Sequence, residues 1–252
     1  QDDSEEVRLA ATLALGRIAR QGDPDIACLL AARLSDGSSS VRMAAAEAFR
    51  LTFSRGDPAA VSAAAPLLRH CWPHVRQVAL ATLERIGSEG DMRAVPDMVE
   101  CIRDMDKGVR MSAVVALGRI VAKDDCKTIF AIAACLKDFD WEVRVATVET
   151  LGRIAERGSA VSIRAVSEQL QHSSPIVREA AINALKRIAK KEKTATGSGH
   201  IMACIEHQEL WANTLRKVPS GPLPEVVPAV RKCRLQPLPR PHGQRHGWFE
   251  ED

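Results

Sequence analysis

The sequence predicts an all-α fold, a right-handed α-solenoid of stacked antiparallel helix pairs with a period of 34 residues. Three observations carry this prediction: a recurring Val-Arg pair, apolar columns at helical spacing around it, and Gly-Asp punctuation in constant register. A fixed period of this length is typical of stacked supersecondary units rather than of one globular core. The Val-Arg pair recurs six times at that interval, at residues 7–8, 41–42, 75–76, 109–110, 143–144 and 177–178.

The helix opened by each Val-Arg pair is here called helix B. Small or apolar residues stand mostly at offsets 0, 3, 4, 7, 8 and 11 from each Val. These offsets trace one stripe of a helix with 3.6 residues per turn. Many stripe positions are Ala, so a neighbouring helix can approach closely. The expected B helices cover residues 7–18, 41–52, 75–86, 109–120, 143–154 and 177–188.

Each helix B is followed by a repeated two-residue turn motif, here called the punctuation. Gly there supplies the left-handed conformation that follows a helix, and the next Asp or Ser can cap the helix that follows. The punctuation reads Gly22-Asp23, Gly56-Asp57, Gly90-Asp91, Asp124-Asp125 and Gly158-Ser159. The following apolar run is the second helix of the pair, helix A. A short turn then carries Asp36, Asp104 or Asp138 and leads back to the next Val-Arg pair.

The pattern DxxxxVRxxAxxALGRI is clearest from Asp104 to Ile120 and from Asp138 to Ile154. It resembles the HEAT family, in particular the short HEAT-like repeats of the phycobilisome-lyase type, over about residues 1–190. Tetratricopeptide repeats fit less well because the chain has no Tyr, and the ankyrin Thr-Pro-Leu-His motif is absent. The resemblance implies that the B helices line a concave surface.

Three regions are predicted along the chain. Residues 1–193 form the solenoid of about six repeats, with the first repeat incomplete. Residues 194–218 form a linker and a helix that could cap the open end of the array. Residues 219–252 begin with a Pro-rich run and are expected to be extended and partly disordered. Because the chain opens on a helix B without its helix A, we expect a fragment, a processed product or a truncated gene model, in which any targeting peptide is lost with the missing part.

The composition of the chain argues against several classes of partner and site. Lys and Arg total 35 against 32 Asp and Glu, a near-balance that argues against a nucleic-acid partner. The seven Cys form no CxxC motif, so zinc-ribbon and thioredoxin chemistry lose their main support. No apolar run is long enough to span a membrane. Free thiols suit a reducing compartment, and we expect an intracellular, cytoplasmic location.

No catalytic or cofactor-binding motif stands out. The chain lacks the His-Glu pairs of the HEAT-like iron enzymes of hypusine formation, and it contains no GxSxG, P-loop or GxGxxG motif. His200, Cys204 and His207 could share one helix face, but their spacing matches no zinc pattern. We therefore expect no metal site, no cofactor and no catalytic residue, and we favour a non-enzymatic protein while leaving an enzyme open.

Two arginine columns run through the repeats. The first, Arg8 and its equivalents, is interpreted as structural, pairing with turn aspartates such as Asp36; the alternative is a basic ladder for phosphates. For the second column, a structural and a ligand-binding role are equally open. The columns are Arg8, Arg42, Arg76, Arg110, Arg144 and Arg178, then Arg17, Arg85, Arg119, Arg153 and Arg187.

The face of helix B opposite its core stripe gives the candidate site. Offsets +2, +6 and +9 from each Val should point outward, yet several of these positions are apolar. Met-rich surfaces suit adaptable partner binding; the alternative is that solenoid curvature or a lost segment buries this strip. Trp72 and Trp141 are candidate anchors in the turns, although we favour their folding back on a neighbouring helix. The candidate residues are Leu9, Met43, Arg50, Met111, Val115 and Val145.

These observations predict a protein–protein interaction scaffold that grips a partner segment on the concave helix B face. The Pro-Leu-Pro-Arg-Pro stretch at 237–241 could recruit a second partner. The alternative is an enzyme subunit of the phycobilin-lyase type, in which the solenoid holds a tetrapyrrole. A nucleic-acid binder resembling the HEAT-like glycosylases lacks the expected basic bias.

Overall fold

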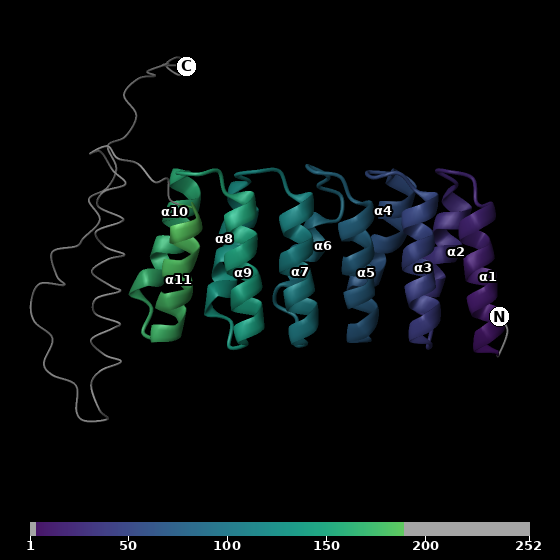
Figure 1. The fold of residues 1–252 in the computed structure, drawn as a ribbon, viewed down its shortest axis with the longest axis horizontal. Helices are drawn as coiled ribbons and strands as arrows, with labels where there is room; N and C mark the ends of the chain where they lie inside the picture. Colours follow the sequence, from purple (N-terminus) through teal and green to yellow (C-terminus); the bar gives the residue numbers. More distant parts are fainter. Residues whose placement is uncertain (1–3, 189–252) are drawn as a thin grey trace, which may run out of the picture. The chain divides into compact units, whose positions relative to one another are not determined.

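The computed structural model describes residues 4–188, and within them every regular element is an α-helix or a 3-10 helix. The helices stand side by side in two layers (Figure 1). The prediction of an all-α solenoid built from antiparallel helix pairs is confirmed. The predicted capping helix at 194–218 and the Pro-rich tail at 219–252 lie outside the described residues.

The B helices form one layer. Each has 14 residues, begins two residues before its Val-Arg Val, and ends at the expected last residue of the apolar stripe. Consecutive B helices pack directly on one another. They are α1 (Glu5–Ile18), α3 (Ser39–Thr52), α5 (Pro73–Ile86), α7 (Lys107–Ile120), α9 (Trp141–Ile154) and α11 (Pro175–Ile188).

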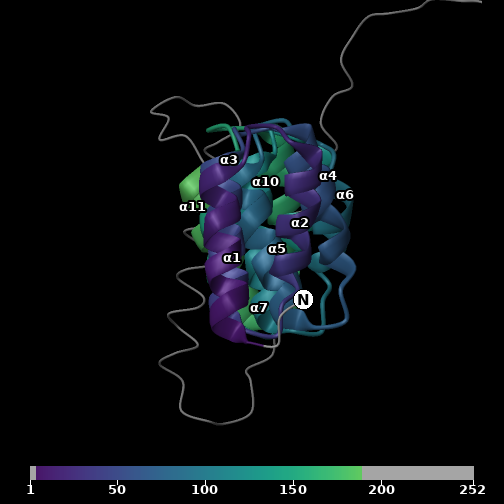
Figure 2. The same ribbon diagram turned by 90° about the vertical axis from the view of Figure 1, so that its right-hand side faces the viewer.

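The A helices form the second layer, which the end-on view of Figure 2 separates from the first. They are shorter, and three of them tighten into a 3-10 turn before the chain returns to the next helix B. Asp23 caps the first of them by accepting from the backbone N–H groups of Asp25 and Ile26. The elements are α2 (Pro24–Leu34), α4 (Pro58–Ala64) with η1 (Ala65–Arg69), α6 (Val95–Cys101), α8 (Cys126–Ala134) with η2 (Cys135–Lys137), and α10 (Ala160–Ser167) with η3 (Glu168–Gln171).

The core lies between the two layers. In α3 the buried residues stand at the six predicted stripe offsets, from Val41 to Thr52. The first helix departs from this pattern, because Val7 is 48% and Ile18 77% exposed. No helix A precedes α1 among the described residues, so the apolar stripe of α1 is only partly covered. The buried stripe of α1 is therefore less complete than that of α3.

Backbone hydrogen bonds join successive repeats where helix B turns into helix A. The N–H of Gly56 donates to the carbonyl of Ile86 at 2.6 Å, and the N–H of Gly90 to the carbonyl of Ile120 at 2.6 Å. The last carbonyls of a helix have no partner inside that helix. These turns therefore satisfy the last carbonyl of the next helix B. The glycines hold a φ near +80°, as their place in the punctuation predicted.

Consecutive B helices approach closely at a small-residue column. A Cβ atom built on Gly16 would lie 2.8 Å from Cβ of Ala48, and one built on Gly118 would lie 2.5 Å from Cγ2 of Thr150. Real Cβ atoms do not come that near, so glycine permits this backbone spacing. These glycines therefore serve helix packing.

Candidate functional site: the helix B face

The solvent-facing side of the B helices, here called the helix B face, is built from offsets +2, +6 and +10 after each Val. Offset +9 is mixed: Arg50 of α3 is exposed there as predicted, whereas Gly118 of α7 is buried because it packs against Thr150 of the next helix B. The neighbouring offset +10 carries the exposed side chains of Arg85, Arg119 and Arg153 instead. A helix turns by about 100° per residue, so neighbouring offsets can differ in burial.

The candidate apolar residues lie on this face with unequal exposure. Met43 is 70% exposed, Val145 47% and Met111 37%, whereas Leu9 and Val115 are half-buried. The strip is interrupted at α5, where Gln77 donates to Oδ1 of Asp106 at 2.8 Å. Curvature of the described solenoid does not bury Met43, Val145 or Met111, so that part of the alternative is wrong for these three residues.

Charged side chains border the apolar strip. Arg50, the one charged candidate, is exposed and pairs with Glu47 on its own helix. Glu47 also pairs with Arg85 of the next helix B at 3.3 Å. The hydrogen bond from Arg50 lowers the pKa of Glu47 below its ordinary value. Both members of this pair are therefore charged at neutral pH.

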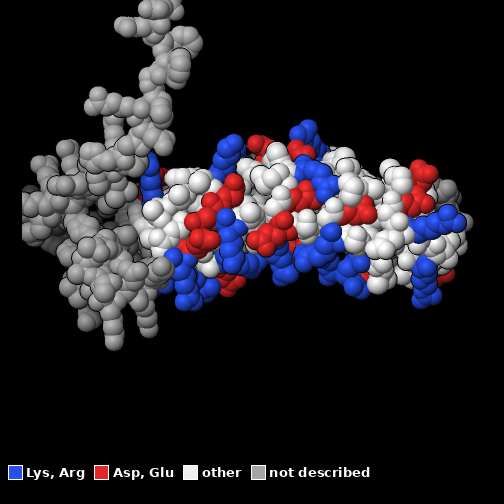
Figure 3. Space-filling model, turned by 90° about the horizontal axis from the view of Figure 1, so that it is seen from above, with Lys and Arg blue, Asp and Glu red and all other residues white. Residues whose placement is uncertain are grey.

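The second arginine column thus has a partly structural role. Arg119 pairs with Glu84 of the preceding helix B at 2.7 Å, as Arg85 does with Glu47. Within residues 4–188, no ion pair is recorded for Arg153 of α9. Figure 3, seen from above, shows Lys and Arg side chains recurring along one long edge of the described helices, with acidic side chains beside them.

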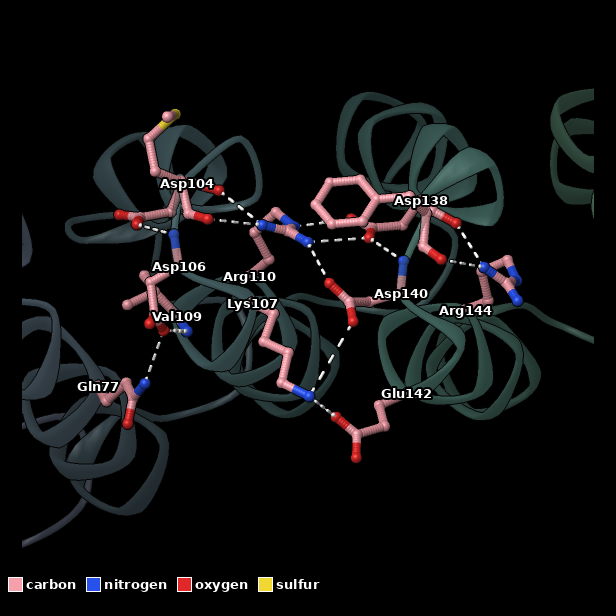
Figure 4. A network of polar contacts seen from close by, with 12 residues as sticks. Gln77, Asp104, Asp106, Lys107, Val109, Arg110, Asp138, Asp140, Glu142 and Arg144 are labelled. Atoms are coloured by element: carbon pink, nitrogen blue, oxygen red, sulfur yellow. Dashed lines mark hydrogen bonds and ion pairs between the residues drawn. The ribbon is translucent and has the colours of Figure 1, made fainter.

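Three arginines of the first column tie repeat to repeat, as the structural interpretation predicted. Nε of Arg8 lies 2.9 Å from Asp36, Nη2 of Arg76 lies 2.7 Å from Asp104, and Nε of Arg110 lies 2.7 Å from Asp138. In each case the Asp belongs to the turn of the next repeat. Arg110 also bonds Asp140 and lies over the ring of Phe139 (Figure 4). We call this series the Arg–Asp ladder.

The ladder has two positions without an aspartate. The column that holds Asp36, Asp104 and Asp138 holds His70 and His172 in the other two turns. Arg42 and Arg144 face these turns, and their recorded hydrogen bonds go to backbone carbonyls. Sequence reasoning passed over these histidines, although the 34-residue register places them in the aspartate column.

The aromatic anchors lie at the starts of B helices. Trp72 is the N-cap residue of α5 and is 48% exposed, while Trp141 is the first residue of α9 and 64% exposed. The favoured expectation that they fold back is wrong for Trp141, most of whose surface is open. Trp72 lies between two imidazoles, at 5.4 Å from His70 and 5.5 Å from His74.

Thiol and metal chemistry is limited in the part of the chain that the structure describes. Burial raises the pKa of Cys101 to about 11 and that of Cys135 to about 12, so both stay protonated at neutral pH. Over residues 4–188 no three His, Cys, Asp or Glu side chains gather as a metal site would need. His200, Cys204 and His207 lie outside the described residues.

Among the described helices, none combines the length and apolar character needed to cross a bilayer.

Comparison with known proteins agrees with this architecture. An engineered protein known from its crystal structure superposes with a TM-score of 0.50 at 21% identity, over 87% of this chain and 62% of that one. A second engineered protein gives 0.48 at 22% identity, covering 75% of this chain and 94% of that one. A designed armadillo repeat protein in complex with the peptide (KR)4 gives 0.48 at 17% identity, covering 71% and 91%. At such identities the likeness concerns the fold alone.

The search of curated proteins finds no match to this sequence. The family model for HEAT repeats matches residues 1–84 and 129–196, which together are more than half of the chain. Both stretches contain the Val-Arg register and the helix pairs described above. The chain belongs to the HEAT repeat family.

Proposed function

We propose that this protein is a non-enzymatic interaction scaffold. In this proposal the helix B face is concave and binds a segment of a partner protein. The observation that carries the proposal is the exposure of Met43, Met111 and Val145 at one repeated offset on α3, α7 and α9. A solvated helix face normally carries polar side chains there. Apolar side chains gathered on an exposed face are typical of interaction surfaces.

The chemistry of this face suits an extended or helical segment with apolar anchors. Methionine is flexible and polarizable, so it adapts to several partner shapes. Neighbouring B helices should lie about 10 Å apart, so Met43 and Met111 on alternate helices lie about 20 Å apart, within reach of one short peptide. The paired charges of Glu47, Arg50 and Arg85 flank the strip and provide a polar rim.

The test is the double variant Met43→Glu with Met111→Glu. An apolar partner segment would have to desolvate two carboxylates. The double variant should therefore no longer capture the proteins that the wild type captures. The helical circular-dichroism signal and the melting temperature should stay nearly unchanged, because both side chains are exposed. Truncation after Lys193 should leave capture intact.

A matched control uses methionines away from the helix B face. Met92 is 49% and Met105 96% exposed, and both lie in turns. Met92→Glu with Met105→Glu adds the same charge and should retain capture. Unchanged affinity in the helix B variant, or an equal loss in the control variant, would place the site elsewhere.

Three finer predictions accompany the scaffold proposal. Membership of the phycobilisome-lyase subtype, with a tetrapyrrole held by the solenoid, rests on repeat resemblance alone, and repeats do not transmit function. An absorption scan of the purified protein with and without bilin tests it directly. Recruitment of a second partner by residues 237–241 concerns the part of the chain outside the described residues. The cytoplasmic location also stays a prediction.

A further inference from the structure

We call a ladder junction closed where the turn holds an aspartate, and open where it does not. In the closed junctions, each turn aspartate makes two kinds of contact. One carboxylate oxygen accepts the backbone N–H two residues later, as Asp104 does from Asp106 and Asp138 from Asp140, both at 2.9 Å. The carboxylate also accepts from the arginine of the preceding repeat. In Asp138 both oxygens accept from Arg110, at 2.7 and 3.0 Å. The aspartate thus holds its own turn and closes the junction between repeats.

His70 makes only the first of these contacts. Its Nδ1 accepts the backbone N–H of Trp72 at 3.1 Å, the counterpart of the aspartate contact. A ring nitrogen that accepts a hydrogen bond carries no proton, so in the neutral ring the proton is on Nε2. Where an aspartate presents a second acceptor, His70 presents a donor. A guanidinium has only donors, so His70 cannot close the junction with Arg42.

Arg42 is nevertheless held as the other ladder arginines are. Its Nη1 donates to the carbonyls of Asp36 at 2.7 Å and Gly37 at 2.9 Å. Arg110 makes the same two contacts with its own turn. Nε of Arg110 then bonds the next aspartate, but Nε of Arg42 is buried and has no hydrogen-bond partner among the described residues. Nε of Arg76 is also unpartnered, yet Nη2 of that residue reaches Asp104.

The surroundings of this open junction are cationic and aromatic. The position that holds Asp140 in the closed Arg110 junction holds Trp72 here. The ring of His74 packs against Trp72. Burial is the main cause that lowers the pKa of His74, and the nearby charge of Arg42 lowers it further. The adjacent ladder acid, Asp36, is already bonded to Arg8 at 2.9 Å.

We infer that Arg42 and His70 form a binding site for a carboxylate, supplied by an Asp or Glu side chain of an acidic peptide segment. The bound carboxylate would take the place of the missing aspartate, accepting from the Arg42 guanidinium and from Nε2–H of His70. The half-exposed ring of Trp72 provides an apolar contact for the residue next to that acid. This site is on the turn edge of the solenoid, and it stands whether or not the helix B face binds a partner.

A carboxylate fits this position better than a phosphate. In the closed Arg110 junction, the arginine binds a planar carboxylate by donating two hydrogen bonds to Asp138. A second open junction, between Arg144 and His172, repeats the arrangement: Nδ1 of His172 accepts the N–H of Ser174 at 3.1 Å. It has Ser174 where the first has Trp72, so the aromatic contact is absent there.

The test measures binding of a fluorescein-labelled, N-acetylated hexaglutamate peptide to the full chain by fluorescence anisotropy at fixed ionic strength. His70→Asp closes the junction internally and should weaken binding by about tenfold or more, the effect expected for losing charge-assisted hydrogen bonds. Its melting temperature should not fall, because Arg42 gains a partner. Arg42→Gln removes the cation and should weaken binding to a similar degree.

A matched control separates the site from general charge. Cys71→Asp adds the same negative charge at the exposed neighbouring residue and should weaken binding by no more than about threefold, as expected for a screened surface charge. Unchanged binding in His70→Asp and Arg42→Gln overturns the inference, and so does an equal loss in Cys71→Asp. Displacement of the peptide by inorganic phosphate, with no displacement by acetate at the same ionic strength, overturns the carboxylate assignment. Because every variant keeps Met43 and Met111, failure here leaves the helix B proposal intact.

Discussion

Arg110 donates from Nε and Nη2 to both carboxylate oxygens of Asp138, which lies 28 residues later in the turn of the next repeat. The two side chains are 6% and 8% exposed. Removing one partner of a buried pair leaves the other charge buried without compensation. The Arg–Asp ladder is therefore a place where one substitution should affect the contact between two repeats.

Arg110→Ala should lower the free energy of unfolding by about 3–5 kcal/mol, the usual cost of breaking a buried ion pair from one side. The matched control is Arg119→Ala, because Arg119 is an exposed arginine on the same helix that pairs with Glu84. Exposed pairs contribute about 0–1 kcal/mol, so this control should melt close to the wild type. Urea denaturation followed by circular dichroism compares the two, and equal losses would contradict the structural interpretation of the ladder.

Acid should weaken the same kind of contact at Asp36. The hydrogen bond from Arg8 holds the pKa of Asp36 below its ordinary value. A carboxyl with a lowered folded pKa contributes stability that is fully present above its unfolded pKa, about 3.9, and is lost as the pH falls through the folded value. Asp36→Asn should therefore melt lower than the wild type at pH 7, and the difference should shrink below about pH 4. A difference that stays constant from pH 7 to pH 2.5 would contradict this assignment.

The two faces of α7 should respond differently to a charge. Val109 is fully buried and Met111 is 37% exposed, although only two residues separate them. Val109→Asp buries an unpaired carboxylate and should cost several kcal/mol, roughly 3 or more. Met111→Asp should stay within about 0.5–1 kcal/mol of the wild type. Melting temperatures measured by circular dichroism test the pair, and similar losses would show that the two faces are wrongly assigned.

The B helices could be predicted because each repeat restates the same pattern. Six copies of one register fix the period, the buried stripe and the pairing of Arg8, Arg76 and Arg110 with turn aspartates. The outward face was harder to predict, because a single helix pattern does not say which side meets the next repeat. Offset +9 illustrates this: Gly118 lies against Thr150, a contact that depends on the spacing between helices.

The ends of the A helices and the open ladder junction were also beyond the sequence pattern. The 3-10 turn at Ala65–Arg69 gives one local signal, Pro66, which removes a backbone donor. Equivalent turns at Cys135–Lys137 and Glu168–Gln171 have no such residue. The position of His70 in the aspartate column is visible in the sequence, but the acceptor role of its Nδ1 appears only in the hydrogen-bond geometry.

Asp124 combines a conformational cost with two stabilising contacts. It occupies the left-handed position that glycine holds in the other punctuations, with a φ of +59°. Its Oδ1 accepts from the backbone N–H of Glu156 at 3.1 Å and from the hydroxyl of Ser162 at 3.2 Å, both in the next repeat. Asp124→Ala keeps the strained conformation and loses both bonds, so it should cost about 1–3 kcal/mol.

Asp124→Gly is the comparison that separates these effects. It loses the same bonds but relieves the left-handed strain, which is of order 1 kcal/mol for a residue with a Cβ atom. It should therefore be less destabilising than Asp124→Ala in the same urea titration. If the alanine variant were the more stable of the two, the left-handed conformation of residue 124 would be contradicted.

The close approach of B helices gives the last prediction. A Cβ atom at residue 118 would lie 2.5 Å from Cγ2 of Thr150, so Gly118→Ala must move α7 away from α9 or displace Thr150. Overpacking of this kind costs about 1–3 kcal/mol, more than the helix propensity that alanine adds, about 1 kcal/mol. Gly37→Ala is the matched control, because nothing lies within 4 Å of a Cβ atom built there. Thr150→Ala combined with Gly118→Ala removes the clashing methyl group and should recover most of the lost stability. A stable Gly118→Ala variant, or no recovery in the double variant, would show that the B helices are not held at this spacing.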